Sequence, residues 1–152
     1  MSPPIKRHES LQPLSRNHHF GLLLCWKIRE GFRRNIVPER IKRYADWFWL
    51  HHLIPHFDLE ERHVFPILGN SHELIIQAIA EHRRLQSLFE KETNVSETLS
   101  LIEHKLEQHI RFEERVLFNE IQRVATPEQL AQCEEYHKEA EPGLVWDDEF
   151  WK

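Results

Sequence analysis

Two ten-residue segments of the chain share a pattern of residues that bind metal ions in many proteins. HFDLEERHVF occupies residues 56–65 and HIRFEERVLF occupies residues 109–118, so His-x-x-x-Glu-Glu-Arg-x-x-Phe occurs twice, 53 residues apart. Imidazole nitrogen and carboxylate oxygen are both ligands of transition metals. Because residues i and i+4 lie on one face of an α-helix, each His-Glu pair directs its two ligands to one point. The repetition indicates a site with two equivalent halves.

A helical projection of the two segments places each His-Glu pair on a mainly apolar face. Trp49, Leu53, Val64 and Ile67 lie beside His56 and Glu60, and Ile102, Leu106, Val116 and Leu117 lie beside His109 and Glu113. An ionised carboxylate on such a face is costly unless it is paired or binds a metal. The projection turns Glu61 and Arg62 away from the site. We expect Glu61, Arg62, Glu114 and Arg115 to form surface or inter-helix ion pairs that contribute little each.

Two more histidines lie on apolar faces of other predicted helices. His18 shares its face with Leu14, Leu22, Cys25 and Phe32, and His82 is surrounded by Ile75, Ala78, Ile79, Leu85 and Phe89. His19 is the alternative to His18, but its face also carries Ser15, Glu30 and Arg33, so we prefer His18. The predicted metal ligands are His18, His56, Glu60, His82, His109 and Glu113.

These six ligands are too many for one tetrahedral zinc, which takes four. Two ions that share both carboxylates would each have two imidazole nitrogens and two carboxylate oxygens. With an oxo or hydroxo bridge, each octahedral ion keeps about one open position. A ferritin-like site needs Glu-x-x-His on two helices; Glu60 and His63 fit, but Val116 occupies the matching position in the second copy. His63 and His52 remain candidates for further contacts at the site.

The elements that must position these ligands are predicted to be helices, because glycine is rare and apolar residues recur at helical spacing. We expect helices over residues 15–34, 38–65, 71–91 and 96–124, and a shorter one from Thr126 to about Glu139. Ser15 is the expected cap of the first helix, and Pro55 is expected to kink the second. The predicted fold is all-α: an up-down four-helix bundle with a short fifth C-terminal helix and a tail. We expect one domain, 1–152, with its core at about 14–124 and the C-terminal helix and tail at 126–152.

Composition excludes several functions. The chain has 152 residues, 40% of them hydrophobic, and a net charge of −5, which argues against nucleic-acid binding. Its four glycines form no phosphate-binding loop. Cys25 and Cys133 form no disulfide pattern, and we see neither a signal peptide nor a membrane span, so we expect a cytoplasmic protein. The aromatic residues of the tail, Trp146, Phe150 and Trp151, are expected to cover the bundle, to form a homodimer contact or to bind a partner.

The order His18, His56-x-x-x-Glu60, His82 and His109-x-x-x-Glu113 on four successive helices resembles the hemerythrin-like (HHE cation-binding) domain. The segments LSRNHHFGLLLCWKIR and HFDLEERHVFP strengthen this resemblance, which extends over roughly residues 10–124. The resemblance implies a four-helix bundle with a non-heme di-iron site, and roles in oxygen binding, oxygen or iron sensing, or handling of reactive oxygen and nitrogen species. Oxygen-carrying members use five histidines, whereas this chain has Gln86 four residues after His82.

The sequence therefore predicts a protein that holds two Fe ions and binds O2 or a related small ligand, such as peroxide or NO, at an open metal position for sensing, storage or scavenging. Two alternatives remain open. One is a di-iron enzyme that turns over peroxide or NO or repairs iron centres. The other is an iron-responsive interaction module whose fold depends on metal occupancy.

Overall fold

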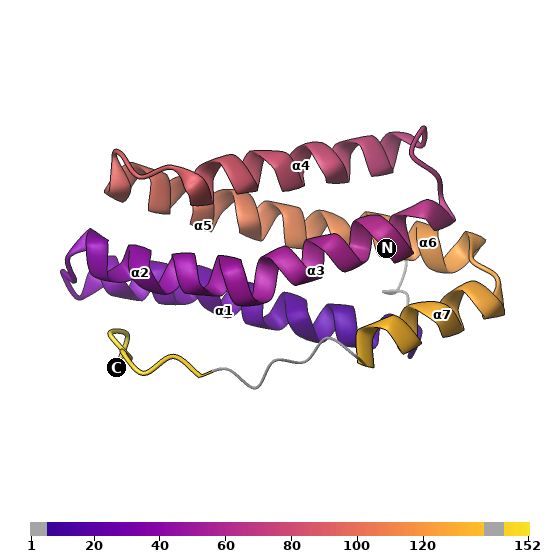
Figure 1. The fold of residues 1–152 in the computed structure, drawn as a ribbon, viewed down its shortest axis with the longest axis horizontal. Helices are drawn as coiled ribbons and strands as arrows, with labels where there is room; N and C mark the ends of the chain where they lie inside the picture. Colours follow the sequence, from indigo (N-terminus) through magenta and orange to yellow (C-terminus); the bar gives the residue numbers. More distant parts are fainter. Residues whose placement is uncertain (1–5, 139–144) are drawn as a thin grey trace, which may run out of the picture.

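The computed structural model describes residues 6–138 and 145–152 of the chain (Figure 1). This part of the chain is all-helical, with no strand. Its elements are α1 (Gln12–Arg33), α2 (Pro38–Phe48), η1 (Trp49–Leu53), α3 (Ile54–Leu59), η2 (Glu60–Val64), η3 (Phe65–Ile67), α4 (Glu73–Glu90), α5 (Val95–Phe112), η4 (Glu113–Leu117), α6 (Phe118–Val124) and α7 (Pro127–Lys138). The all-α prediction is confirmed, and each predicted helix is present with its ends shifted by a few residues.

The long segments α1, α2 with α3, α4, and α5 with α6 lie side by side, and each runs in the opposite direction to the one before it in the chain (Figure 1). α1 packs along α5, α4 also packs along α5, and α2 contacts both α1 and α5. The connections between these segments are short, and a short connection brings consecutive helices together as antiparallel neighbours. No helix in the described part of the chain has the length and apolar character that crossing a bilayer requires.

The second predicted helix continues from Pro38 to Ile67, but it contains two π-helical turns, η1 and η2, and ends in the 3-10 turn η3. A π-helical turn, η1, precedes α3, and the N–H of Ile54 donates to the carbonyl of Trp49. Pro55 lies at the start of α3. A proline in a helix removes a backbone donor and its ring crowds the preceding turn. The wider π turn η1, Trp49–Leu53, is the turn that precedes Pro55. The disturbance expected at Pro55 therefore takes the form of a π segment just before it.

Both copies of the repeated motif contain a π-helical turn at the same place. η2 begins at Glu60 and η4 begins at Glu113, the first glutamate of each copy. In a π turn the hydrogen bonds run between residues i and i+5 rather than i and i+4, and such turns occur often at functional sites. The residues that follow each glutamate consequently lie at different angles around the helix axis than an uninterrupted α-helix would give them.

Two apolar clusters lie on either side of the predicted ligands along each helix. On α1, for example, Leu11 and Leu14 belong to one cluster and Leu24 and Ile28 to the other, with His18 between them. On α4, Ile75 and Ala78 precede His82 and Leu85 follows it in the same way. The core is therefore divided into two apolar parts, and the polar ligands occupy the layer between them.

The first helix begins three residues before Ser15, so the prediction that Ser15 caps it is wrong. Leu11 is the N-cap, and Pro13 lies in the first turn, where a proline costs no hydrogen bond. At the other end of the chain, Thr126 and Gln129 form a reciprocal cap on α7: each side chain accepts from the other residue's backbone N–H, at 3.2 and 2.9 Å. Glu139, the predicted last residue of this helix, lies outside the described residues.

The C-terminal residues 145–152 pack against α1 and α2. Phe150 is 2% exposed and contacts the ring of Tyr44, with 5.8 Å between ring centroids, and the Arg40 guanidinium donates to both carboxylate oxygens of Asp148. A Cβ on Gly31 would lie 2.6 Å from Ile41 Cδ1 and 3.0 Å from Phe150 Cε1. Gly31 thus permits α2 and the tail to approach α1 closely. A homodimer contact through this segment stays a prediction.

We expect Phe150→Ala to lower the free energy of unfolding by about 3 kcal/mol, because it removes a buried ring and leaves a cavity. Urea unfolding followed by far-ultraviolet circular dichroism measures this change. Val145→Ala is the matched control, because Val145 is 88% exposed in the same segment. Equal stability of the two variants would show that the tail does not pack on its own chain.

Candidate metal centre

All six predicted ligands lie in the layer between the two apolar clusters. His18 comes from α1, His56 from α3 and His82 from α4, and Glu60 is the first residue of η2. His109 lies near the end of α5, and Glu113 is the first residue of η4. Their side chains are between 0 and 5% exposed. Residues far apart in the sequence thus meet in one enclosed place.

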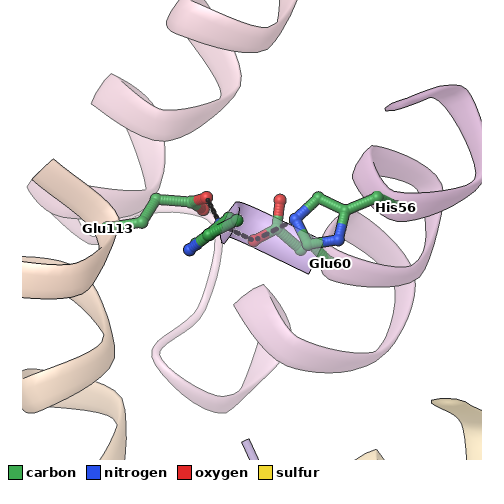
Figure 2. A group of neighbouring side chains, drawn as sticks. His56, Glu60 and Glu113 are labelled. Carbon is green, nitrogen blue, oxygen red and sulfur yellow. Dashed lines mark hydrogen bonds and ion pairs between the residues drawn. The ribbon is translucent and has the colours of Figure 1, made fainter. Parts of the chain in front are cut away.

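The ligand atoms form two groups that share both glutamates. One group contains His18, His56, Glu60 and Glu113, and the other contains Glu60, His82, His109 and Glu113. Within each group one ligand atom from every residue lies within 4.8 Å of the others. The side chains of Glu60 and Glu113 point toward each other, and His56 lies beside Glu60 (Figure 2).

Each glutamate contacts imidazoles from both groups. Glu60 Oε1 lies 3.2 Å from His82 Nε2, and its Oε2 lies 3.4 Å from His56 Nε2. Glu113 Oε1 lies 2.9 Å from His18 Nε2 and 3.2 Å from His109 Nε2. Carboxylates placed in this way can bridge two metal ions, with the imidazoles as the terminal ligands of each.

Several of these buried atoms have no hydrogen-bond partner. They are the Nε2 atoms of His56, His82 and His109, both carboxylate oxygens of Glu60, and Oε2 of Glu113. Leaving a buried polar atom without a partner costs about 1–3 kcal/mol, and more when the group is charged. Six such atoms directed into one place are explained by a ligand that accepts electron pairs from nitrogen and oxygen, which is what a metal ion does. The donor set therefore fits a metal centre.

In each group, one imidazole uses its Nδ1 atom, which points away from the other ligands, to donate a hydrogen bond to a glutamate of the repeated motif. This glutamate is the second of the two consecutive glutamates in its copy. His82 Nδ1 donates to Glu61 Oε2 at 2.7 Å, and His18 Nδ1 donates to Glu114 Oε1 at 2.8 Å. The expected inter-helix ion pairs are present, because Arg83 lies 2.6 Å from Glu61 and Arg7 lies 3.1 Å from Glu114. The prediction that Glu61 turns away from the site is wrong. Glu61 and Glu114 fix the orientation of two imidazoles and direct Nε2 inward.

The remaining two imidazoles also have partners at Nδ1. His109 Nδ1 donates to Glu81 Oε1 at 2.6 Å, and Gln77 donates to the other oxygen of Glu81 at 2.9 Å. His56 Nδ1 lies 3.3 Å from the side-chain amide of Asn17. Glu81 and Asn17 immediately precede His82 and His18 in the sequence. Their adjacency to two predicted ligands is a sequence signal that places both residues near the site, but it does not show which imidazole each of them contacts.

The π turns explain why a helical projection misplaced residues after each motif glutamate. The projection assumes a constant 100° per residue, whereas η2 and η4 advance less per residue. Glu61 and Glu114 lie one residue past the start of each π turn, and their side chains reach imidazoles on α4 and α1. Val116, predicted to face inward, is 44% exposed instead. Leu22 on α1, also predicted inward, is 36% exposed.

The electrostatics of the cluster show how strongly its groups interact. Burial raises the pKa of Glu60, and the charge of Glu113 adds to this, giving a value of about 8. Burial also acts to raise the pKa of Glu113, but His109 and His18 hold it well below its usual range. Burial lowers the pKa of His18, yet hydrogen bonds to Glu113 and Glu114 outweigh it and raise the value to about 9. Glu113 is therefore stabilised as a carboxylate by the neighbouring imidazolium groups, whereas Glu60 is stabilised in its protonated form.

Protons on the other imidazoles are distributed unequally. The pKa of His109 is lowered by burial but raised more by Glu113 and Glu81, to about 10. The pKa of His56 is lowered to about 3, first by burial and then by the positive charge of His18. Positive charge thus concentrates on His18 and His109, the two imidazoles that contact Glu113, and a bound cation would replace it.

The other candidate residues lie outside the two groups. His19 is exposed, so the structure places His18, and not His19, in the cluster. His63 stacks on Tyr136 of α7, with 3.6 Å between ring centroids, and His52 packs against Phe48 at 4.9 Å. Gln86 donates to Glu90 on the exposed side of α4.

Comparison with known proteins supports the interpretation of the cluster. The family model for the hemerythrin HHE cation binding domain matches residues 18–121, most of the chain and all six predicted ligands. No curated protein and no solved structure gives a significant match. The match begins at the first ligand and ends shortly after the last. The chain therefore belongs to the hemerythrin HHE cation-binding domain family.

Proposed function

We propose that the protein is a non-heme di-iron protein built on an up-down four-helix bundle, and that it binds O2 or a related small ligand for sensing, storage or scavenging. The observation that carries this proposal is the pair of overlapping ligand groups with shared carboxylates. His18 and His56 would hold one ion and His82 and His109 the other. Glu60 and Glu113 would bridge them.

The composition of the ligand set favours iron. Mixed imidazole and carboxylate donors suit iron, whereas thiolates, which favour zinc and copper(I), do not contribute to either group. Each ion would receive two nitrogens and two carboxylate oxygens, and a bridging oxygen would leave an octahedral ion with about one position for an external ligand. An iron pair with open coordination supplies reversible binding or reduction of small oxidants.

The chain's own residues define which molecules reach the site. The ligand side chains are enclosed between two apolar clusters, and Phe57 and Phe118 stack on the rings of His82 and His18. An enclosed apolar environment admits a small neutral molecule more readily than a large or charged one. The ion pairs of Glu61 and Glu114 hold the imidazoles in place, so the ligand set is fixed before a small molecule arrives.

The experiment that tests the proposal is the metal content of aerobically purified protein together with its absorption spectrum before and after addition of O2 or NO to the reduced form. About two irons per chain and near-ultraviolet charge-transfer bands that respond to the added gas would support it. One metal or fewer per chain, or colourless zinc protein, would exclude the oxygen chemistry.

We expect Glu60→Gln to reduce bound iron from about two ions per chain to one or fewer, because an amide does not replace a bridging carboxylate. Burial and the charge of Glu113 raise the pKa of Glu60 to about 8, so this group is already neutral in the metal-free protein at pH 6.5, and the variant should then melt at about the same temperature as the metal-free wild type. Iron analysis and thermal unfolding by circular dichroism measure the two effects. Glu97→Gln, an exposed glutamate on α5, is the control. Full iron content in Glu60→Gln would contradict the bridging role.

We expect metal affinity to rise as pH increases from 6.5 to 8. In the metal-free protein, the pKa values of about 8 for Glu60, 9 for His18 and 10 for His109 keep these groups protonated in that range. A metal ion must displace these protons, and each released proton increases the affinity about tenfold per pH unit. Competition between the protein and a calibrated chelator for Co²⁺ measures the slope. An affinity that does not change with pH would contradict this coupling.

A further inference from the structure

The two halves of the centre are related by the sequence repeat. His56, Glu60 and Glu61 correspond to residues 53 positions later, His109, Glu113 and Glu114, and His18 corresponds to His82, 64 positions later. The ring geometry follows the same relation. The His18 and His56 rings are 5.1 Å apart at 67°, and the His82 and His109 rings are 4.8 Å apart at 66°. The halves can therefore be compared contact by contact.

The first pair of outer contacts is equivalent in the two halves. Glu114 accepts from His18 and lies beside Arg7, and Glu61 accepts from His82 and lies beside Arg83. Each contact consists of an imidazole, a carboxylate and a guanidinium. These contacts therefore affect both halves in the same way.

The second pair of outer contacts differs. His109 Nδ1 donates to the carboxylate of Glu81, whereas His56 Nδ1 faces the neutral amide of Asn17. Asn17 and Glu81 occupy corresponding positions, immediately before His18 and His82. Among the hydrogen-bond partners of the four imidazoles, Glu81 and Asn17 are the corresponding pair that differs in charge: Glu81 is negative and Asn17 is neutral.

This difference changes the strength of one ligand. A carboxylate that accepts from Nδ1–H makes Nε2 a stronger donor to a metal, and loss of such a partner typically lowers metal affinity about 10- to 100-fold. An amide oxygen accepts the same hydrogen bond without the negative charge. In the structure the amide nitrogen Nδ2 of Asn17 lies 3.3 Å from His56 Nδ1. For His56 to bind a metal through Nε2, its Nδ1 must carry the proton. The Asn17 amide would then turn by half a rotation, which exchanges its nitrogen and oxygen and lets the oxygen accept from Nδ1–H.

We propose that the two metal positions are unequal: the position formed by His82 and His109 fills first and holds its ion more tightly, and the position formed by His18 and His56 is the exchangeable one. This inference rests on the proposed two-metal centre and adds an order of binding to it. Asn17 and Glu81 act as positioning residues, because they contact imidazoles and not the ions.

The test is a titration of the full-length, metal-free protein with Co²⁺, followed by isothermal calorimetry and by the visible absorption of bound Co²⁺. We expect two steps, with the first about 10- to 100-fold tighter than the second. Asn17→Asp supplies the missing carboxylate, so it should tighten the second step and bring the two affinities together. Glu81→Gln removes the carboxylate from the other half, so it should weaken the first step. His19→Asp, which adds a charge at an exposed position of α1, is the matched control and should retain the wild-type difference.

Two ligand variants assign the steps to their positions. His56→Ala should retain the tight step and lose the weak one, and His109→Ala should retain only weak binding. Far-ultraviolet circular dichroism of each metal-free variant verifies that the helices are intact before its titration is interpreted. The assignment is reversed, and the proposal overturned, if His109→Ala retains the tight step.

Failure of the inference is distinguishable from failure of the proposed function. Two equal steps in the wild type, with no effect of Asn17→Asp or Glu81→Gln, would overturn the inequality and leave the two-metal centre intact. Saturation at one ion or fewer per wild-type chain would overturn the two-metal centre itself, and with it this inference.

Discussion

The structure depends on the cost of placing two carboxylates side by side in an apolar core. Glu60 and Glu113 are fully buried, and both contribute oxygens that have no hydrogen-bond partner. In the metal-free protein the conflict is relieved by protons: burial and the Glu113 charge raise the pKa of Glu60 to about 8, and the imidazoles beside Glu113 take up positive charge. Two cations would satisfy the same atoms directly. The layer between the apolar clusters is therefore arranged for positive charge, and the helices around it hold that arrangement.

The duplicated motif supplies most of the groups that surround the two buried carboxylates, and it does so with few residues. Each copy supplies, from a single helical segment, one imidazole and one buried carboxylate to the cluster, and a second carboxylate that reaches an imidazole on another helix. In each copy the two carboxylates belong to consecutive glutamates, and a π turn begins at the first of them. Four helical segments are thereby connected through hydrogen bonds as well as through apolar packing. Orientation of the imidazoles is consequently a property of the whole fold, and not of any single helix.

Sequence reasoning identified what depends on local pattern and failed where the winding of the helix changes. The motif spacing was sufficient to find His56, Glu60, His109 and Glu113, and the apolar faces were sufficient to find His18 and His82, because i and i+4 relations survive within each α-helical stretch. Glu61 and Val116 were misplaced: Val116 lies three residues past the start of a π turn that a constant 100° projection does not contain, and the side chain of Glu61 reaches His82 on α4. Asn17 and Glu81 were missed because their role depends on which helix lies opposite, and sequence spacing does not give that.

The outer contacts also show how the chain limits the charge it accumulates around the centre. Glu61 and Glu114 are each compensated by an arginine, so they orient imidazoles while adding little net charge. Glu81 is held instead by Gln77, a neutral amide, and so contributes a negative charge close to His109. A carboxylate in place of Asn17 would add another beside a core that already contains two buried glutamates. Repulsion among these groups destabilises the metal-free protein. A neutral residue at one of the two corresponding positions therefore lowers the cost of folding, and on the proposed two-metal centre it would also lower the metal affinity of that half.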